Sequence, residues 1–258
     1  AEDQQQAIGT EVLTAMEILR ELEIIGDYYD YNMNPDETVT RADFAVAAAK
    51  SLGAKVSGRQ NTTYYYDVPP SHYACAEINA LTDMGLVTGY DKTSFHPDDI
   101  METAAACRIL LTALGYEKTA ERDGGYPYGY LKHARELKLL DASQTSSELT
   151  RGAMLTMLYE ALKAPMMTPE VTSSEGRIEY QKDEDKTILA VSHKAYYHKG
   201  IVDGVNKSSF NGTVFSKENE VEIDGTVYES TVDLSDFLGE EIEYIERKLK
   251  EDDDGEVI

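Results

Sequence analysis

The sequence contains no tryptophan, only two cysteines and no long apolar run. Cys75 and Cys107 are too few for a disulfide framework, so they form either a single pair or, as the simpler reading, two small buried thiols. A membrane-spanning helix needs about 18 or more consecutive apolar residues, and no such stretch occurs. The sequence therefore predicts no membrane insertion.

Positive charge is also scarce. The 258 residues carry 24 Lys and Arg against 48 Asp and Glu, a net charge of −24. A basic field that would attract nucleic acid is thereby excluded, whereas a local basic pocket for one small anionic group is not. The histidines follow no metal-ligand spacing, and no nucleophile and base form a convincing set, so we expect no metal, no cofactor and no catalytic residues.

Internal repetition is the strongest positive feature of the chain. An offset of 62 residues places PDETVTRADFAVAAAKSLG (35–53) over PDDIMETAAACRILLTALG (97–115), with Pro and Leu-Gly in register. A third copy aligns LKHARELKLL (131–140) with the first helix of the unit and LTRGAMLTMLYEAL (149–162) with the second. Each copy reads as helix, loop, helix, and the second helix begins at a threonine cap, Thr40 or Thr150.

The second copy carries the most specific motif, YYYDVPPSHYACAEINALTDMGLVTGYDKTSFHPDD (64–99). Together with TRAD (40–43) and TRGA (150–153), it resembles the S-layer homology domain. The resemblance implies a mainly α fold, in which three repeats form a helical spindle with pseudo-threefold symmetry, plus a small C-terminal β-rich domain. The expected parts are the repeats 8–56, 64–117 and 120–164 within 8–164, a linker 165–176, the β-rich domain 177–250 and an acidic tail 251–258.

In the β-rich part, alternating apolar residues predict strands at 187–191, 199–204, 219–230 and 240–246. An Asp-Gly pair inside IDGTVY predicts a hairpin turn, and 233–239 predicts a short helical turn closed by glycine. The tail EDDDGEV lacks the ligand spacing of a calcium loop and is expected to be a solvated acidic end.

The resemblance also implies a function. Members of the family bind secondary cell-wall polysaccharide, typically a pyruvylated amino sugar, in grooves between neighbouring repeats. We therefore expect a non-catalytic, secreted anchor at the cell surface or in the cell wall, monomeric when isolated and part of a longer surface protein. The alternatives are the targeting part of a larger wall enzyme and a scaffold whose degenerate repeats bind another protein.

The ligand-binding residues implied by the resemblance are Arg41, Asp67, Tyr73, Gly89 and Arg151. A guanidinium can grip the pyruvyl carboxylate, helix N-terminal amides can add donors, an aromatic ring can cover the sugar, and glycine allows close approach. Only the groove between copies one and two is complete.

The other two grooves lack partners. Thr103 replaces the arginine of copy two, and Arg151 has only Asp3 and Tyr28 to Tyr31 nearby as substitute partners. Plainer readings remain open for each residue: surface ion pairs for the arginines, a turn cap for Asp67 and core packing for Tyr73.

Overall fold

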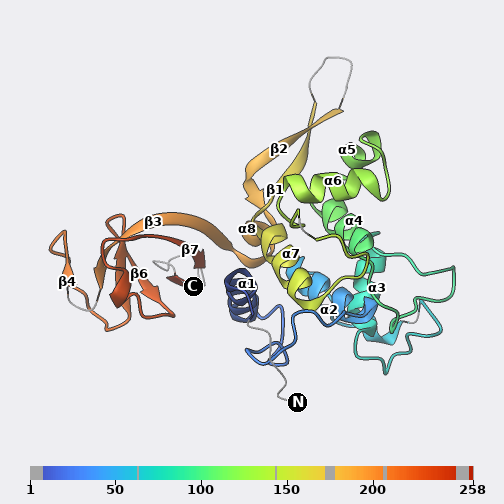
Figure 1. Cartoon of the computed structure of the whole chain (residues 1–258), viewed down its shortest axis with the longest axis horizontal. Helices are drawn as coiled ribbons and strands as arrows, with labels where there is room; N and C mark the ends of the chain where they lie inside the picture. The colour runs from blue at the N-terminus through green and yellow to red at the C-terminus, as the bar shows by residue number, and fades with distance from the viewer. Residues whose placement is uncertain are drawn as a thin grey trace. The chain divides into compact units, whose positions relative to one another are not determined.

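The computed structural model describes residues 8–62, 64–142, 144–171, 178–205, 208–247 and 256–257. The chain divides into two compact units, residues 1–188 and 189–258. The first unit holds helices α1 to α7 and the strands β1 and β2, and the second holds the remaining strands (Figure 1).

Three helix pairs build most of the first unit. The first helix of each pair is α1 (Thr10–Glu21), α3 (Cys75–Asp83) or α6 (Tyr128–Glu136). The second helix is α2 (Arg41–Ser51), α4 (Thr103–Ala113) or α7 (Arg151–Lys163). A 3₁₀ turn (Arg59–Asn61) and a short helix, α5 (Glu117–Arg122), lie in the connections.

The helix ends follow the chemistry that the sequence predicts. The hydroxyls of Thr40 and Thr150 accept the amide hydrogen of the third helical residue, at 3.1 and 3.3 Å, which confirms the two threonine caps. Gly53 and Gly115 follow α2 and α4 with φ of +63° and +85°, a left-handed conformation that favours glycine.

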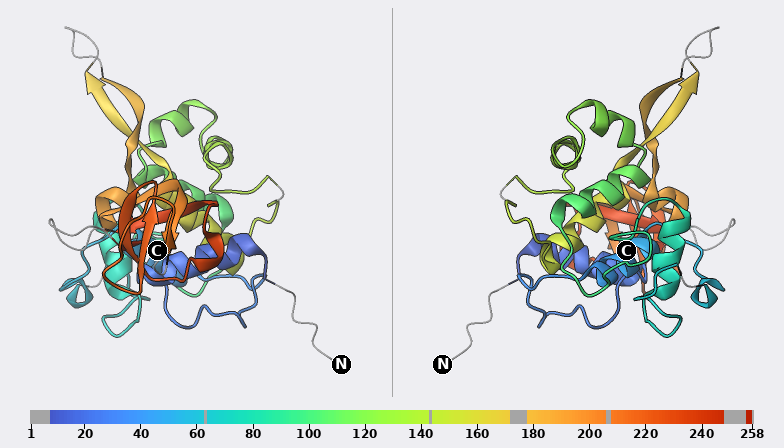
Figure 2. Two further views of the ribbon diagram at one scale, coloured as in Figure 1. Left: turned by 90° about the vertical axis from the view of Figure 1, so that its left-hand side faces the viewer. Right: turned by 90° about the vertical axis from the view of Figure 1, so that its right-hand side faces the viewer.

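The pairs pack in a cyclic order. Helix α3 packs against α2, α6 against α4, and α1 against α7, so each first helix contacts the second helix of another copy. Figure 2 shows these helices gathered in the first unit. The interior is aliphatic and alanine-rich, and its most deeply buried large side chains include Met16, Leu19, Phe44, Ile78, Leu81, Leu110 and Leu111.

Three backbone hydrogen bonds close a ring at the centre of this packing. Val39 donates its amide hydrogen to the carbonyl of Leu149, Leu149 donates to Met101, and Met101 donates to Val39, at 3.0, 2.8 and 2.9 Å. All three side chains are buried. Because each residue lies just before a second helix, the ring fixes the starts of α2, α4 and α7 relative to one another.

The first unit also contains a β-hairpin. Strands β1 (Pro165–Val171) and β2 (Ile178–Thr187) pair antiparallel. The amide of Met167 donates to the carbonyl of Leu114 at 2.8 Å, and the hydroxyl of Tyr116 donates to the carbonyl of Pro165 at 3.0 Å. Residues 165–171 of the expected linker therefore form a strand that packs on the end of α4, and 172–177 lie outside the described residues.

The second unit is a small sheet that closes on itself. Its strands are β3 (Ala195–Val205), β4 (Ser208–Ser209), β5 (Glu220–Ile223), β6 (Thr226–Ser230), β7 (Glu241–Arg247) and β8 (Glu256–Val257). The order is β4-β3-β5-β6-β8-β7, and β3 also pairs with β7. The enclosed core consists of Val202, Val205, Val221, Ile223, Tyr228, Leu234 and Tyr244.

The mainly α class is wrong. In the part of the chain that the structure describes, the strands form two sheets, of two and six strands, rather than a minor appendage to a spindle. The strand predicted at 187–191 is also wrong, because residues 188–193 form helix α8 (Ile188–His193). A short apolar run such as TILAV has too little periodicity to separate strand from helix.

Other local predictions in this part are confirmed. Asp224 and Gly225 have φ of +47° and +77°, as a tight hairpin turn between β5 and β6 requires. A single 3₁₀ turn (Ser235–Phe237) precedes Gly239, whose φ is +88°. Of the predicted acidic tail, residues 251–255 and 258 lie outside the described residues, and 256–257 form β8.

Candidate functional site

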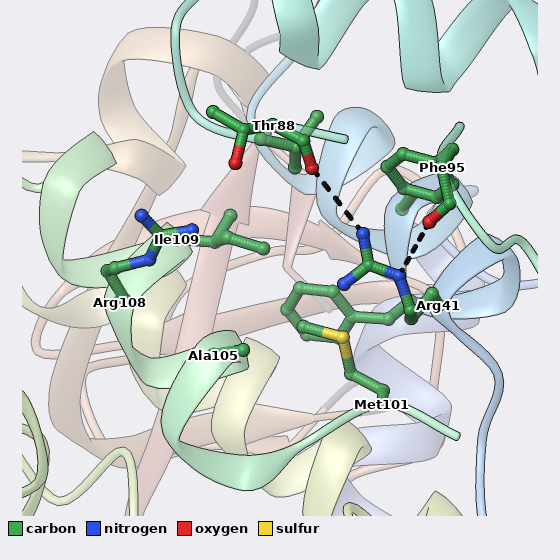
Figure 3. Close-up of a pocket in the computed structure, with 10 residues that line it drawn as sticks. Arg41, Thr88, Phe95, Met101, Ala105, Arg108 and Ile109 are labelled. Atoms are coloured by element: carbon green, nitrogen blue, oxygen red, sulfur yellow. Dashed lines mark hydrogen bonds between the residues drawn. The ribbon is translucent and has the colours of Figure 1, made fainter. Parts of the chain in front are cut away.

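A small pocket lies at the junction of copies one and two. It is formed by the first turn of α2, the loop that follows α3, and α4 (Figure 3). Its free volume of about 20 Å³ admits little more than a water-sized group, so a larger ligand would lie across its mouth. The lining residues are Arg41, Phe44, Ala45, Val87, Thr88, Phe95, Met101, Ala105, Arg108 and Ile109.

Arg41 is held firmly at one side of this pocket. Its Nε donates to the carbonyl oxygen of Phe95 at 3.0 Å, and Nη2 reaches the carbonyl of Thr88 at 3.5 Å (Figure 3). The guanidinium carbon lies 4.5 Å from the centroid of the Phe95 ring. Two carbonyls and one ring therefore fix the orientation of the guanidinium, and the Nη1 amino group makes no hydrogen bond to any residue that the structure describes.

The charge of Arg41 is poorly compensated. Its side chain is half-buried, and burial lowers the pKa of Arg41, opposed by the more distant negative charge of Asp99. No carboxylate in the described part of the chain lies within ion-pair distance of it. A partly desolvated cation without a counter-ion is costly, and an anionic ligand would relieve that cost.

The helix N-terminal amides are not free to assist. The amides of Arg41 and Ala42 donate to the carbonyls of Asp99 and Pro97, both at 2.9 Å. The amide of Asp43 donates to the Thr40 cap. The expectation that the start of α2 offers donors to a ligand is therefore wrong, because the loop of copy two between α3 and α4 accepts from Arg41 and Ala42 and the cap accepts from Asp43.

Asp67 lies next to this site without contacting Arg41. Its carboxylate accepts the amide hydrogens of Phe95, at 2.9 Å, and His96, at 2.8 Å. Because Arg41 donates to the carbonyl of the same Phe95, Asp67 positions the acceptor that orients the arginine. The carboxylate acts as a cap of the 95–96 turn, 28 residues further along the chain, rather than of the local turn before Val68 that the plainer reading supposed.

Tyr73 lies at the same junction but outside the pocket lining. Its ring is 62% exposed and stacks on His72 with 4.8 Å between ring centroids. Its hydroxyl donates to Asp43 of α2 at 2.7 Å, and burial followed by this hydrogen bond raises the pKa of Tyr73. The core alternative for Tyr73 is therefore wrong, and the exposed ring remains available as a surface for stacking.

Gly89 is required by close packing of the loop. A Cβ at this position would collide with the carbonyl oxygens of Asp91 and Ser94 and lie 2.6 Å from Cε1 of Tyr65. The loop from residue 88 to residue 95 supplies both carbonyls that hold Arg41. Gly89 thus shapes the site through the backbone rather than by leaving space for a ligand.

Arg151 occupies the equivalent position in copy three but is neutralised. Its two Nη atoms pair with the two carboxylate oxygens of Glu37 at 2.5 and 2.7 Å. It also contacts the hydroxyl of Tyr28, and its guanidinium carbon lies 4.6 Å from the centroid of that ring. Among the substitute partners that the sequence suggested, Tyr28 is thus in contact, and Asp3 lies outside the described residues.

The pairing of Arg151 with Glu37 was not predicted, although the repeat contained the signal. The 62-residue offset places Glu37 over Asp99. The longer glutamate reaches Arg151, whereas the shorter Asp99 binds Nδ1 of His96 at 3.0 Å and leaves Arg41 without an ion pair. Glu37 and Asp99 occupy the same position in two copies and differ by one methylene group. The arginine beside Glu37 is neutralised, and the arginine beside Asp99 is not.

The third junction has no guanidinium at the helix start. Thr103 is buried, and its hydroxyl donates to the carbonyl of Ser146 at 3.0 Å. Tyr126 keeps the aromatic position and donates to Glu102 at 3.2 Å. Arg108, the one cation of α4, was also missed by sequence reasoning because it lies five residues beyond the motif position.

Other reactive groups form no competing site in the described residues. Cys75 and Cys107 are free thiols, both buried, and burial raises the pKa of Cys107 to about 12. The described side chains include no group of three or more His, Cys, Asp or Glu arranged to hold a metal ion. No helix in the described ranges combines the length and the apolar character needed to cross a membrane.

Comparison with known proteins agrees with this architecture. The family model of the S-layer homology domain matches residues 8–45 and 64–101, which include Arg41 and Asp67. The chain is 28% identical over 234 residues, 89% of its length, to a cell surface protein of Thermoanaerobacter kivui, of which that segment is 29%. It is 30% identical over 170 residues, 64% of its length, to a middle cell wall protein of Brevibacillus brevis, of which that segment is 16%.

A third relative is a cellulosome-anchoring protein of Acetivibrio thermocellus, 36% identical over 66 residues, which are 25% of this chain and 15% of that protein. The chain thus spans less than a third of the length of these relatives. Together, the two S-layer homology matches and the surface and wall relatives indicate the cell surface or cell wall as its location.

Proposed function

We propose that the chain is a non-catalytic module that anchors a surface protein to cell-wall polysaccharide. The observation that carries this proposal is the half-buried guanidinium of Arg41, which is fixed in a pocket and lacks a carboxylate partner in the described structure. In a chain with a net charge of −24, such a cation is expected to have a specific anionic ligand.

The ligand that fits this pocket best is a wall sugar carrying a carboxylate, such as a pyruvyl ketal. The free Nη1 group can donate charge-assisted hydrogen bonds to the carboxylate, while Phe95, Phe44 and Met101 offer apolar contact to a methyl group. The exposed ring of Tyr73 can cover a neighbouring sugar face. The substituent lies across the mouth of the pocket beside Arg41, and the sugar ring lies outside it.

The three copies of the repeat do not contribute equally to binding. Residues 8–164 act as three copies of the repeat, with 120–164 as the third, and one working groove lies between copies one and two. Arg151 contributes structure rather than binding because Glu37 already satisfies it. The second unit, which follows Ile188, is not part of the binding surface, and the isolated chain is a monomer.

Sedimentation with purified cell wall tests this proposal. We expect the chain to co-sediment with native wall and to lose most binding when mild acid has removed pyruvyl groups from the wall. Arg41→Ala should reduce binding to native wall to the level seen with acid-treated wall. Equal binding to both walls by the unmodified chain would contradict a carboxylate-dependent anchor and would favour a protein partner instead.

A further inference from the structure

The pocket that contains Arg41 has a second arginine. Arg108 extends from the middle of α4 and lines the same pocket. Figure 3 shows the two guanidinium groups on opposite sides of it, with Ala105 and Ile109 on the α4 side between them. Because α2 and α4 belong to neighbouring copies of the repeat, the two copies each contribute one positive charge.

Neither arginine is neutralised within the described residues. The lining of the pocket includes no aspartate or glutamate. Arg108 makes no hydrogen bond or ion pair with the described residues, and its guanidinium carbon lies 6.0 Å from the centroid of the Tyr126 ring. Four other arginines of the chain do pair with carboxylates: Arg20, Arg59, Arg122 and Arg151.

Two like charges in one pocket repel each other. Arg108 is among the groups that lower the pKa of Arg41, after the larger effect of burial, while Asp99 and Glu102 oppose the shift from a distance. The chain has 48 acidic residues and only 24 basic ones, so carboxylates that could pair with Arg41 and Arg108 are abundant. An arrangement that leaves both unpaired is stabilised when anions enter the pocket.

We propose that Arg108 is a second anion-binding residue of this groove, and that the bound glycan segment carries a second negative charge besides the one bound by Arg41. The inference rests on the proposed function of the groove. Arg41 is tied to the carbonyls of Phe95 and Thr88 and cannot turn toward Arg108 without losing both bonds. An anion bound at the Nη1 group of Arg41 does not require a contact with Arg108, so Arg108 can bind another group.

Calorimetry with two defined probes tests this inference. One probe is a pyruvylated disaccharide with a single carboxylate, and the other is the same disaccharide with an added phosphate monoester. We expect the unmodified chain to bind the phosphorylated probe about tenfold more tightly, from one further charge-assisted contact. Arg108→Gln should remove this advantage while lowering the affinity for the singly charged probe far less than Arg41→Ala does.

Two further variants serve as controls. Arg135→Gln removes the same charge from an exposed position on α6 and should leave both affinities unchanged. Arg108→Lys should restore part of the advantage, because it keeps the charge but not the planar fork. Thermal unfolding of Arg108→Gln should match the unmodified chain, since Arg108 makes no hydrogen bond to the described residues.

The outcomes separate this inference from the proposed function. Equal affinity of the unmodified chain for the two probes, or equal losses in Arg108→Gln and Arg135→Gln, would overturn the role of Arg108 while the Arg41 groove stands. If Arg41→Ala leaves both affinities unchanged, the proposed groove fails, and the second-charge inference fails with it.

Discussion

Arg41 and Asp67 bind the same residue from opposite sides. Asp67 accepts the amide hydrogen of Phe95, and Arg41 donates to the carbonyl oxygen of Phe95. The two side chains come from different copies of the repeat, so their shared partner joins the copies at the pocket. The aspartate therefore acts on the arginine through the backbone, and no hydrogen bond or ion pair joins the two side chains.

Replacing Asp67 should weaken the fold and the binding together. Asp67→Ala leaves the amides of Phe95 and His96 without their acceptor, which should cost about 1–3 kcal/mol of unfolding free energy. Wall binding should fall because the Phe95 carbonyl no longer holds Arg41 in place. Urea unfolding and wall sedimentation measure the two effects. A loss of binding with unchanged unfolding free energy would instead indicate a direct contact between Asp67 and the sugar.

The two arginines should differ sharply. Arg41→Ala should weaken binding to pyruvylated wall by about 1.5–3 kcal/mol, the range for a charge-assisted contact in a partly desolvated site. Arg151→Ala should change binding little, because Arg151 is already paired with Glu37. Binding isotherms on purified wall test the contrast, and equal losses for the two variants would show that Arg151 also binds ligand.

The second unit should be dispensable for binding, but the hairpin should not be dispensable for stability. A chain that ends at Ile188 should bind wall as the whole chain does. One that ends at Lys163 loses the contacts of Pro165 and Met167 with Tyr116 and Leu114, at a cost of about 1–3 kcal/mol. Wall sedimentation measures the binding of both chains, and thermal unfolding measures their stability. Loss of binding by the chain ending at Ile188, with its helices still folded, would assign part of the function to the second unit.

The loop that holds Arg41 should be insensitive to mild acid. Hydrogen bonds from Thr93 and Ser94 lower the pKa of Asp91 to about 2, below its ordinary value near 4. The stabilisation is therefore complete above about pH 4 and is lost as the pH falls through about 2. The amide resonances of Thr93 and Ser94, followed by NMR, should keep their positions down to about pH 4.

A matched variant isolates this effect. Asp91→Asn keeps an oxygen acceptor but has no titrating proton, so the difference in melting temperature between it and the unmodified chain should shrink between about pH 4 and pH 2. A difference that stays constant over that range would mean that the charge of Asp91 contributes nothing to the loop.

The repeat made part of this structure predictable. Helical periodicity and the threonine caps located α2 and α7, and at the third junction Thr103 stands at the helix start in place of the arginine. These features depend on residues close together in the chain, where propensity and capping act directly. The strand content of the chain was underestimated, in part because the first strand, PMMTPEV, contains two prolines and was interpreted as a linker.

The contacts that decide which groove is open were not predictable in the same way. Glu37 and Arg151 are 114 positions apart in the sequence. They pair because backbone hydrogen bonds between the copies bring residues 37–39 beside residues 149–151, and because the Glu37 side chain is long enough to contact Arg151. Arg108 lies outside the motif, and it shares a pocket with Arg41 because residues of both α2 and α4 line that pocket. Such relationships arise from packing between copies, which a single sequence does not specify.

Titration calorimetry with a pyruvylated disaccharide, on the unmodified chain and on Arg41→Ala, tests whether Arg41 holds the ligand. We expect a single binding site in the unmodified chain and its loss in Arg41→Ala, while Arg151→Ala keeps the site. Three equivalent sites in the unmodified chain, or a site that survives Arg41→Ala, would contradict the assignment of binding to the uncompensated arginine between copies one and two.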